Sequence, residues 1–210
     1  MKLAPTENQY RLVIKETHKL DKNRDYKLLE VGAGQRILKN HIPNNIVYES
    51  LDFGKQHDFD FNLDDGKFPI KDNTYDIIVC NETLEHVLYP DKVIKEIIRV
   101  AKKDATFFFS LPNEYNFVMR FYYLIGKQGA VDEAFHVVEK HLHIHKPRVK
   151  DILNLFSKYF QIMEVDYIWQ SRSSMFYSSA RLLDKIINGL AKINPSLFAR
   201  CVSVKVINKK

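Results

Sequence analysis

The stretch that most constrains the fold runs from Leu28 to Gly34, with the sequence Leu-Leu-Glu-Val-Gly-Ala-Gly. A short apolar run leads into two glycines one residue apart, and a helix can begin soon after them. Glycine accepts backbone angles that a β-carbon forbids, so the pattern predicts a buried strand that ends in a tight turn. Such a turn can let a ligand approach the main chain, but an ordinary turn after a buried strand has the same pattern.

The remainder of the chain alternates short apolar runs with helical patterns. Strands are predicted at about 27–31, 46–51, 75–80, 105–111, 161–169 and 201–206, with a short one near 59–63. The predicted helices include 7–19, 91–101 and a helical stretch over 115–140 that is broken near Gly126 and Gly129. This alternation indicates the α/β class, with a mainly parallel sheet and helices on both faces. A length of 210 residues suits one domain, so we expect a single domain over 1–210.

Composition and charge narrow the function classes. The two cysteines, Cys80 and Cys201, show no pairing pattern, and no stretch resembles a signal peptide or a membrane span, so we expect a cytoplasmic protein. The net charge is +6, and residues 141–210 alone carry 12 basic against 4 acidic residues. A basic last third can attract nucleic acid, anionic lipid or an acidic substrate, or can simply be a solvated surface.

The loops after the strands indicate the kind of cofactor. Asp52 ends a predicted strand 20 residues after Gly32, where a carboxylate can accept both hydroxyls of a ribose or merely cap a turn. Ile37 stands where a dinucleotide fingerprint needs a small residue, and no phosphate-binding loop is present, which argues against NAD and ATP. A nucleoside that carries an amino acid would instead place its ammonium group near Glu30.

Three segments together resemble the class I S-adenosylmethionine-dependent methyltransferases, within the broad small-molecule subgroup that has type 11-like domains. They are LLEVGAG at 28–34, FPIKDNTYDIIVCNETLEHV at 68–87 and FFFSLPN at 107–113. The resemblance implies a Rossmann-like, seven-stranded, mostly parallel sheet with an antiparallel last strand. It also implies S-adenosylmethionine as the cofactor, a cofactor-binding core over about 26–114, and a cover for the acceptor site from about 115–150 and 170–200.

The same resemblance implies roles for individual residues. The methionine part of the cofactor would lie against Glu30, Gly32, Ala33 and Gly34, with Asn81 and Glu82 beside the transferable methyl group. The ribose would be held by Asp52 and the adenine by Phe53, Asn62 and Leu63, with Asp64 as an alternative adenine contact. The chain departs from the family where Arg36 replaces a third glycine that many members have, and where Lys103-Asp104-Ala105 replaces a Pro-Gly-Gly turn.

Histidines are the candidate bases for activating an acceptor. His86 follows Glu82 by four residues, so both would share one face of a helical turn, although His86 can equally pack or cap that turn. His141, His143 and His145 alternate and would share one side of an extended segment. We expect catalysis from His86, His141 or His143 and no metal, because no carboxylate or cysteine pattern accompanies the histidines.

Residues 178–200 predict an amphipathic helix. Its apolar stripe is Leu182, Leu183, Ile186, Ile187, Leu190 and Ile193, and its basic face is Arg181, Lys185, Asn188 and Lys192. We expect the stripe to pack over the acceptor pocket, since helices between strands usually bury their apolar face. The alternative is a peripheral contact of 178–200 with an anionic membrane.

The expected function is methyl transfer to a small molecule, namely O-methylation of a sugar, a glycan precursor or a lipid-like compound. Two alternatives stay open. An RNA methyltransferase would use the basic last third, but an Asn-Pro-Pro-Tyr type loop is absent at Cys80 to Thr83. A silent scaffold would bind S-adenosylmethionine without turnover. The oligomeric state has no signature in the sequence.

Overall fold

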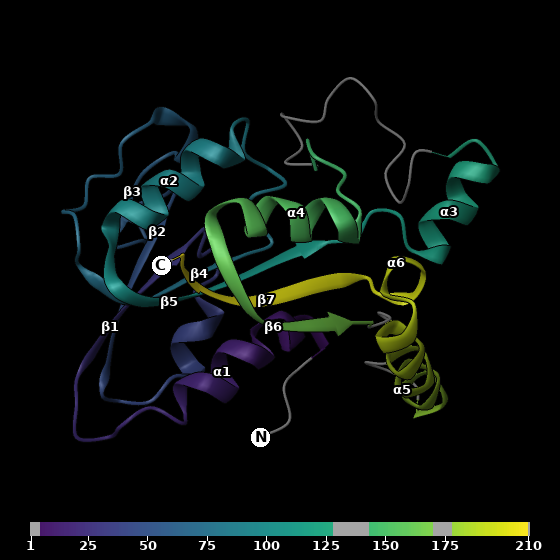
Figure 1. Ribbon diagram of the computed structural model, residues 1–210, viewed down its shortest axis with the longest axis horizontal. Helices are drawn as coiled ribbons and strands as arrows, with labels where there is room; N and C mark the ends of the chain where they lie inside the picture. The colour runs from purple at the N-terminus through teal and green to yellow at the C-terminus, as the bar shows by residue number, and fades with distance from the viewer. Residues whose placement is uncertain (1–4, 128–142, 170–177, 210) are drawn as a thin grey trace.

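The computed structural model describes residues 5–127, 143–169 and 178–209 (Figure 1). Seven strands form one sheet: β1 Tyr26–Val31, β2 Ile46–Asp52, β3 Phe59–Asp60, β4 Tyr75–Asn81, β5 Ala101–Pro112, β6 Phe160–Ile168 and β7 Cys201–Asn208. The helices are α1 Arg11–Thr17, α2 Pro90–Val100, α3 Phe117–Leu124, α4 Val149–Tyr159, α5 Ser178–Ile193 and α6 Pro195–Phe198. Short 3-10 helices lie at Pro5–Tyr10, Ile37–His41 and Leu63–Asp65.

The strand order is β3-β2-β1-β4-β5-β7-β6, and the neighbours from β3 to β5 are parallel. The last strand, β7, runs antiparallel to both β5 and β6. This confirms the predicted Rossmann-like, seven-stranded, mostly parallel sheet with an antiparallel last strand. The order reverses direction between β1 and β4, so a crevice is expected at the carboxyl ends of these two strands.

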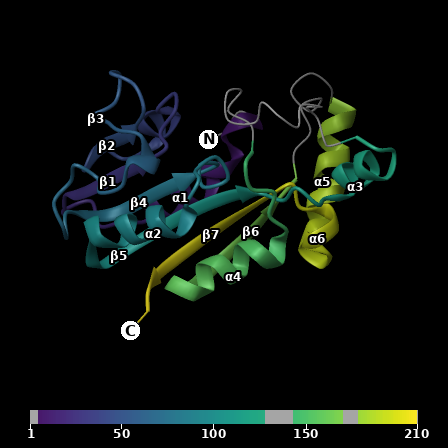
Figure 2. The same ribbon diagram turned by 90° about the horizontal axis from the view of Figure 1, so that it is seen from above.

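The central strands are apolar on both sides because helices cover both faces of the sheet. Alternate residues of a strand point to opposite faces, and Ile78 and Cys80 of β4 join the core beneath α2 and α4, whereas Ile77 and Val79 join the core beneath α1. Figures 1 and 2 show the same arrangement, with α2 and α4 on one face and α1 on the other. Side chains from β4 are therefore fixed from both sides.

Some elements differ from the expectation. The helix expected over 7–19 begins as a 3-10 turn, and the segment after the glycine turn forms the 3-10 helix Ile37–His41 only. Of the helical stretch expected over 115–140, the structure describes the eight-residue α3, and the positive φ of 78° at Gly126 confirms the predicted break there; residues 128–142, with the second predicted break at Gly129, lie outside the described residues. Glycine at such a φ is a common helix stop.

The prediction that the apolar stripe of α5 packs against the protein is wrong. Of its six residues only Ile187 is buried, while Leu182, Leu183, Ile186, Leu190 and Ile193 are exposed. The helix instead packs through a different face, on which Asp184 and Ala191 are buried beside Ile187. Polar contacts of Asp184 and Asn188 with Trp169, just after β6, select that face.

Beyond the carboxyl end of β5, the helices α3, α5 and α6 gather at one end of the molecule (Figures 1 and 2). Asn113, just after β5, donates hydrogen bonds to Ser196 O at 3.1 Å and Ala199 O at 2.8 Å, which fix α6 to this edge. Phe117 of α3 stacks on Trp169 with ring centroids 4.9 Å apart. Among the helices of the described ranges, none has the length and hydropathy to cross a membrane.

Candidate functional site

The turn after β1 is built from residues in the left-handed region. Gly32 has φ 71° and Gly34 has φ 48°, and a β-carbon on Gly32 would lie 2.1 Å from Thr83 Oγ1. Only glycine fits at Gly32, for both steric and backbone reasons. Arg36, at the position of the family's third glycine, also has a positive φ of 56°, held by hydrogen bonds to Gln56 O at 2.8 Å and Asp58 Oδ2 at 3.0 Å.

Glu30 is the buried acid of this turn, with 1% of its surface exposed. Its Oε2 accepts a hydrogen bond from the Tyr48 hydroxyl, while its Oε1 has no partner. Burial raises the pKa of Glu30 to about 7, against the lowering effect of Tyr48 and Tyr10. A buried acceptor without a partner beside an open turn suits a cationic ligand group such as an ammonium.

Asp52, at the end of β2, joins its loop to the glycine turn. Its Oδ2 accepts from Gly34 N at 2.8 Å, and its Oδ1 accepts from Phe53 N at 2.7 Å. Each carboxylate oxygen can accept a further hydrogen bond, so ribose hydroxyls can still bind here. Phe53 is 77% exposed, so its ring is free to stack on a flat ligand. Ala33, by contrast, is buried beneath the turn.

The segment after β3 is a capped turn. Asn62 accepts a hydrogen bond from Asp64 N at 3.1 Å and donates one to Asp65 Oδ1 at 3.2 Å, and Leu63 follows it, half-buried. Asp64 Oδ1 accepts from Leu88 N at 2.9 Å, which ties this turn to the loop after β4. Of the candidates for adenine contact, Asn62 and the alternative Asp64 both use side-chain atoms to hold the loop in place.

Asn81 and Glu82, at the end of β4, are held by different parts of the chain. Asn81 donates to Gln9 O at 3.2 Å and so fastens the N-terminal segment over the site. Glu82 has a positive φ of 48°, and its Oε1 accepts from Ser110 Oγ and Cys201 Sγ, both at 3.2 Å. Burial raises the pKa of the Glu82 carboxyl. Its side chain is directed toward β5 and β7.

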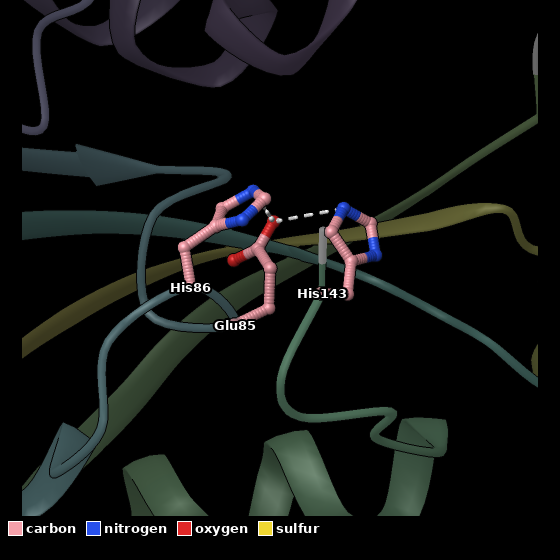
Figure 3. A group of neighbouring side chains, drawn as sticks. All are labelled: Glu85, His86 and His143. Atoms are coloured by element: carbon pink, nitrogen blue, oxygen red, sulfur yellow. Dashed lines mark ion pairs between the residues drawn. The ribbon is translucent and has the colours of Figure 1, made fainter. Parts of the chain in front are cut away.

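Just beyond Glu82, the titratable side chains of Glu85, His86 and His143 meet, as Figure 3 shows, and Glu114 joins them through a hydrogen bond to His143. Glu85 and His86 come from the loop after β4, and His143 comes from the irregular segment before α4. The Nε2 atoms of His86 and His143 lie 3.9 Å and 4.0 Å from Glu85 Oε1, and the two rings meet edge to face at 4.8 Å. His143 Nδ1 is hydrogen-bonded to Glu114, which follows β5. We call Glu85, His86, Glu114 and His143 the imidazole–carboxyl cluster.

Main-chain hydrogen bonds bring these distant segments together. Ile144 N and His145 N both donate to Glu85 O, at 2.9 Å and 3.0 Å, and the His145 ring bonds to Val87 O at 2.9 Å. The segment 143–145 is thereby fastened along 85–87. His145 is used for this attachment and lies outside the cluster, whereas His141 lies outside the described residues.

Glu85 is the unusual member of the cluster. It is fully buried, and neither carboxyl oxygen has a hydrogen-bond partner. Burial, with the charge of Glu82 second, raises the pKa of Glu85 well above its ordinary value, so the carboxyl is neutral near pH 7. The gaps of 3.9 and 4.0 Å are too wide for direct hydrogen bonds to the imidazoles. Among the described residues, the Glu85 carboxyl is therefore a buried polar group without a hydrogen-bond partner.

The same atoms could also hold a metal ion, since the ligand atoms of Glu85, His86 and His143 all lie within 4.8 Å of one another. A carboxylate on the second nitrogen of His143 is a frequent feature of metal-bound histidines. Metal binding would require Glu85 to lose its proton, whereas burial favours the protonated carboxyl when no cation is bound.

Sequence reasoning missed Glu85, Glu114 and Tyr48. Glu85 stands directly before His86 in the Glu-x-Leu-Glu-His segment, so its position was available as a signal. Glu114 and Tyr48 had no signal in the sequence, because their partners, His143 and Glu30, are distant in the chain.

Comparison with known proteins supports one assignment for this architecture. Residues 6–159 match the family model described as a methyltransferase domain. No curated protein sequence matches the chain.

Solved structures share the fold at low sequence identity. A candidate methyltransferase from Bacillus halodurans C-125 has a TM-score of 0.61 and 13% identity, with 93% of this chain and 96% of that chain covered. An S-adenosylmethionine-dependent methyltransferase from Archaeoglobus fulgidus has a TM-score of 0.56 and 12% identity, with coverage of 97% and 93%. Phosphoethanolamine N-methyltransferase 2 of Haemonchus contortus, in complex with S-adenosylmethionine, has a TM-score of 0.56 and 10% identity, with coverage of 97% and 53%.

The residues at the crevice suit this cofactor. Glu30 offers a buried acceptor for an ammonium group, the glycine turn leaves the main chain accessible, and Asp52 has acceptor capacity for ribose hydroxyls. When bound, S-adenosylmethionine supplies a methyl carbon that its sulfonium makes electrophilic. The fold, the family match and this crevice together identify the chain as a member of the class I S-adenosylmethionine-dependent methyltransferases.

Proposed function

We propose that the enzyme methylates a hydroxyl oxygen of a small-molecule acceptor, in the class of sugars, glycan precursors and lipid-like compounds, and that the imidazole–carboxyl cluster activates this hydroxyl. The observation that carries the proposal is the His143–Glu114 pair beside the unpartnered Glu85 carboxyl. Two members of the cluster, Glu85 and His86, follow Glu82 on the loop after β4, next to the residues that we assign to the methionine part of the cofactor.

For the cofactor, we assign the ammonium group to Glu30, the methionine part to the turn of Gly32, Ala33 and Gly34, and the ribose to Asp52. The exposed ring of Phe53 and the capped turn at Asn62 and Leu63 would flank the adenine. Asn81 and Glu82 would lie near the methyl group, with Glu82 held in place by its bonds to β5 and β7.

The tautomer of His143 makes it the best candidate for the base. An ionised Glu114 can only accept, so the Nδ1 of His143 carries the proton and donates it to this hydrogen bond. The lone pair of Nε2 then faces the cluster and can take a proton from the acceptor hydroxyl. A neutral Glu85 can donate a hydrogen bond to the same oxygen if that oxygen lies to one side of the line between the two atoms, which are 4.0 Å apart, at about 2.8 Å from each.

His143→Gln tests this role. We expect the rate to fall by about 10²-fold or more, with the affinity for S-adenosylmethionine and the melting temperature unchanged. His86→Gln and His141→Gln serve as parallel variants, and Glu114→Gln should lower the rate at unchanged cofactor affinity because the tautomer is no longer fixed. EDTA should leave the wild-type rate unchanged. Full activity of His143→Gln on the true acceptor would remove the histidine from the mechanism.

The proposal includes a cytoplasmic location. Cys80 and Cys201 are both free thiols, which fits a reducing compartment. Fractionation of the cells that produce the protein, probed with an antibody, tests this location.

A further inference from the structure

The surface of α5 has an apolar stripe that nothing in the described structure covers. Leu182, Leu183, Ile186, Leu190 and Ile193 are each between 37% and 82% exposed. With 3.6 residues per turn, these five side chains fall within an arc of about 100° on one side of the helix. Surface apolar residues are common singly, but five on one helix face form an interaction surface.

The orientation of α5 is fixed by contacts on its other side. Trp169 Nε1 donates to Asp184 Oδ1 at 3.1 Å, and Trp169 N donates to Asn188 Oδ1 at 2.8 Å. Asn188 Nδ2 donates back to Trp169 O at 2.8 Å. Ile187 and Ala191 are buried on the same side. The helix therefore cannot turn its apolar stripe inward without breaking these bonds, so the stripe faces outward.

Positive charge borders the stripe. Arg181, Lys185 and Lys192 are exposed and lie in an arc next to the apolar residues, whereas the single acid of α5, Asp184, is buried. A hollow beside Ile193 at the end of α5 is also lined by Arg120, Arg148 and Lys150. The outward face of α5 thus combines apolar side chains with cations and has no exposed carboxylate.

The neighbouring helix α3 adds apolar side chains at the same end of the molecule (Figure 2). Phe121, Leu124 and Ile125 are each more than half exposed and follow helical spacing. Phe117 fixes α3 through its contacts with Trp169 and Phe198. Both helices lie beyond the carboxyl end of β5, at the same edge of the sheet as the loops that follow β1 and β4.

We propose that the outward face of α5 docks on an anionic lipid surface, with the apolar stripe in the interface between headgroups and acyl chains and the flanking cations on the headgroups. An apolar arc bordered by Lys and Arg is the composition that such interfacial helices use. The charge decides between occupants, because a second copy of this chain would bring the same cations against one another. The inference is independent of the acceptor and of the methyl-transfer chemistry.

The test is flotation of the full chain with vesicles of two compositions: phosphatidylcholine alone, and equal parts phosphatidylcholine and phosphatidylglycerol. We expect binding to the anionic vesicles only, weakened by salt. Lys185→Glu with Lys192→Glu should lower the partition coefficient at least about 25-fold, since each cation near an anionic surface contributes about fivefold. Leu183→Ser with Ile186→Ser should lower it at least tenfold while leaving the salt dependence in place.

Matched control variants make the same kinds of substitution, charge reversal and loss of an apolar side chain, at exposed positions outside α5. Lys22→Glu with Lys71→Glu makes the same change in net charge at exposed positions, and Met163→Ser removes an exposed apolar side chain on β6. These variants should bind anionic vesicles as the wild type does. All substituted side chains are exposed, and unchanged melting temperatures verify folding.

Failure of the wild type to float with anionic vesicles would overturn the proposal, as would equal losses in the control variants. Sedimentation that finds a dimer, which the Leu183 and Ile186 changes dissociate, together with no vesicle binding, would assign the stripe to a second copy instead. Neither result would affect methyl transfer in solution, so the proposed function is tested independently of vesicle binding.

Discussion

Removal of the Glu30 charge should change stability in opposite directions at low and high pH. The pKa of Glu30 is about 7 in the folded protein against an ordinary value of 4.5, so the folded state holds its proton more tightly than the unfolded state does. Stability is therefore lost as the pH rises from 4.5 through 7. Between pH 5 and pH 8 the loss from this group amounts to about 2.5 kcal/mol.

Glu30→Gln removes this titration while its amide oxygen can still accept from Tyr48. The amide NH₂ is a new buried donor that costs about 1–2 kcal/mol. Without cofactor, the variant should be less stable than the wild type at pH 5 and more stable at pH 8, with a total change of about 2.5 kcal/mol in the difference. For a chain of this size, that is a relative change in melting temperature of about 5–10 °C.

The same substitution should weaken S-adenosylmethionine binding by about 1–3 kcal/mol, because the ammonium group loses its carboxylate. In the wild type, affinity should fall as the pH drops below about 7, where Glu30 becomes protonated. Urea unfolding at both pH values and calorimetry give the two quantities. Glu49→Gln is the control. The Oε2 of Glu49 also accepts a hydrogen bond from a tyrosine, Tyr75, at 2.7 Å, but Glu49 is not among the residues assigned to the cofactor. The cofactor affinity of this variant should equal that of the wild type. A difference in unfolding free energy between Glu30→Gln and the wild type that is the same at pH 5 and pH 8 would refute the buried-charge argument.

Gly32→Ala should cost about 2–4 kcal/mol of stability, because it adds contact with Thr83 to left-handed strain, whereas Gly34→Ala, with open space around it, should cost only about 1–2 kcal/mol. Chemical unfolding measures both, and Thr83→Ala should recover part of the loss in the first variant alone; equal costs at the two glycines would contradict the steric argument. Asp52→Ala should weaken S-adenosylmethionine binding by about 1–3 kcal/mol in calorimetry, with no binding of NAD or ATP to either protein. Unchanged affinity in Asp52→Ala, or tight NAD binding, would contradict the ribose assignment.

The fold and the cofactor crevice were predictable because their signals are local. An apolar run that ends in Gly-x-Gly marks a strand and its turn within seven residues, and Asp52 directly ends its own strand. The order of the strands follows from their alternation with helices, together with the family resemblance. The positive φ of Arg36 could not be expected from its residue type, because tertiary hydrogen bonds to Gln56 O and Asp58 Oδ2 stabilise this conformation.

The imidazole–carboxyl cluster could be predicted only in part, because its members are joined by tertiary contacts. His86 and His143 are visible as histidines, but their proximity depends on main-chain bonds from 144 and 145 to Glu85. The partner of His143, Glu114, lies 29 residues away. No period or spacing in the sequence encodes such pairs.

The face on which α5 packs was predicted wrongly for a related reason. A periodic apolar stripe indicates a helix but does not say which side meets the protein. Asp184 and Asn188 look like surface residues in the sequence, yet both bond to Trp169 at the end of β6. The hydrogen bonds of Asp184 and Asn188 with Trp169 thus determine how α5 is oriented, whereas the five exposed apolar side chains do not.

We propose that the protein transfers the methyl group of S-adenosylmethionine to an acceptor oxygen beside His143. The most direct measurement incubates the protein with S-adenosylmethionine carrying a deuterated methyl group and a metabolite extract, and locates the label by mass spectrometry. We expect one small-molecule product with a labelled methyl group on oxygen, formed by the wild type and lost with His143→Gln while cofactor binding persists. Label in RNA, label on nitrogen or carbon alone, or no labelled product from any fraction would contradict the claim.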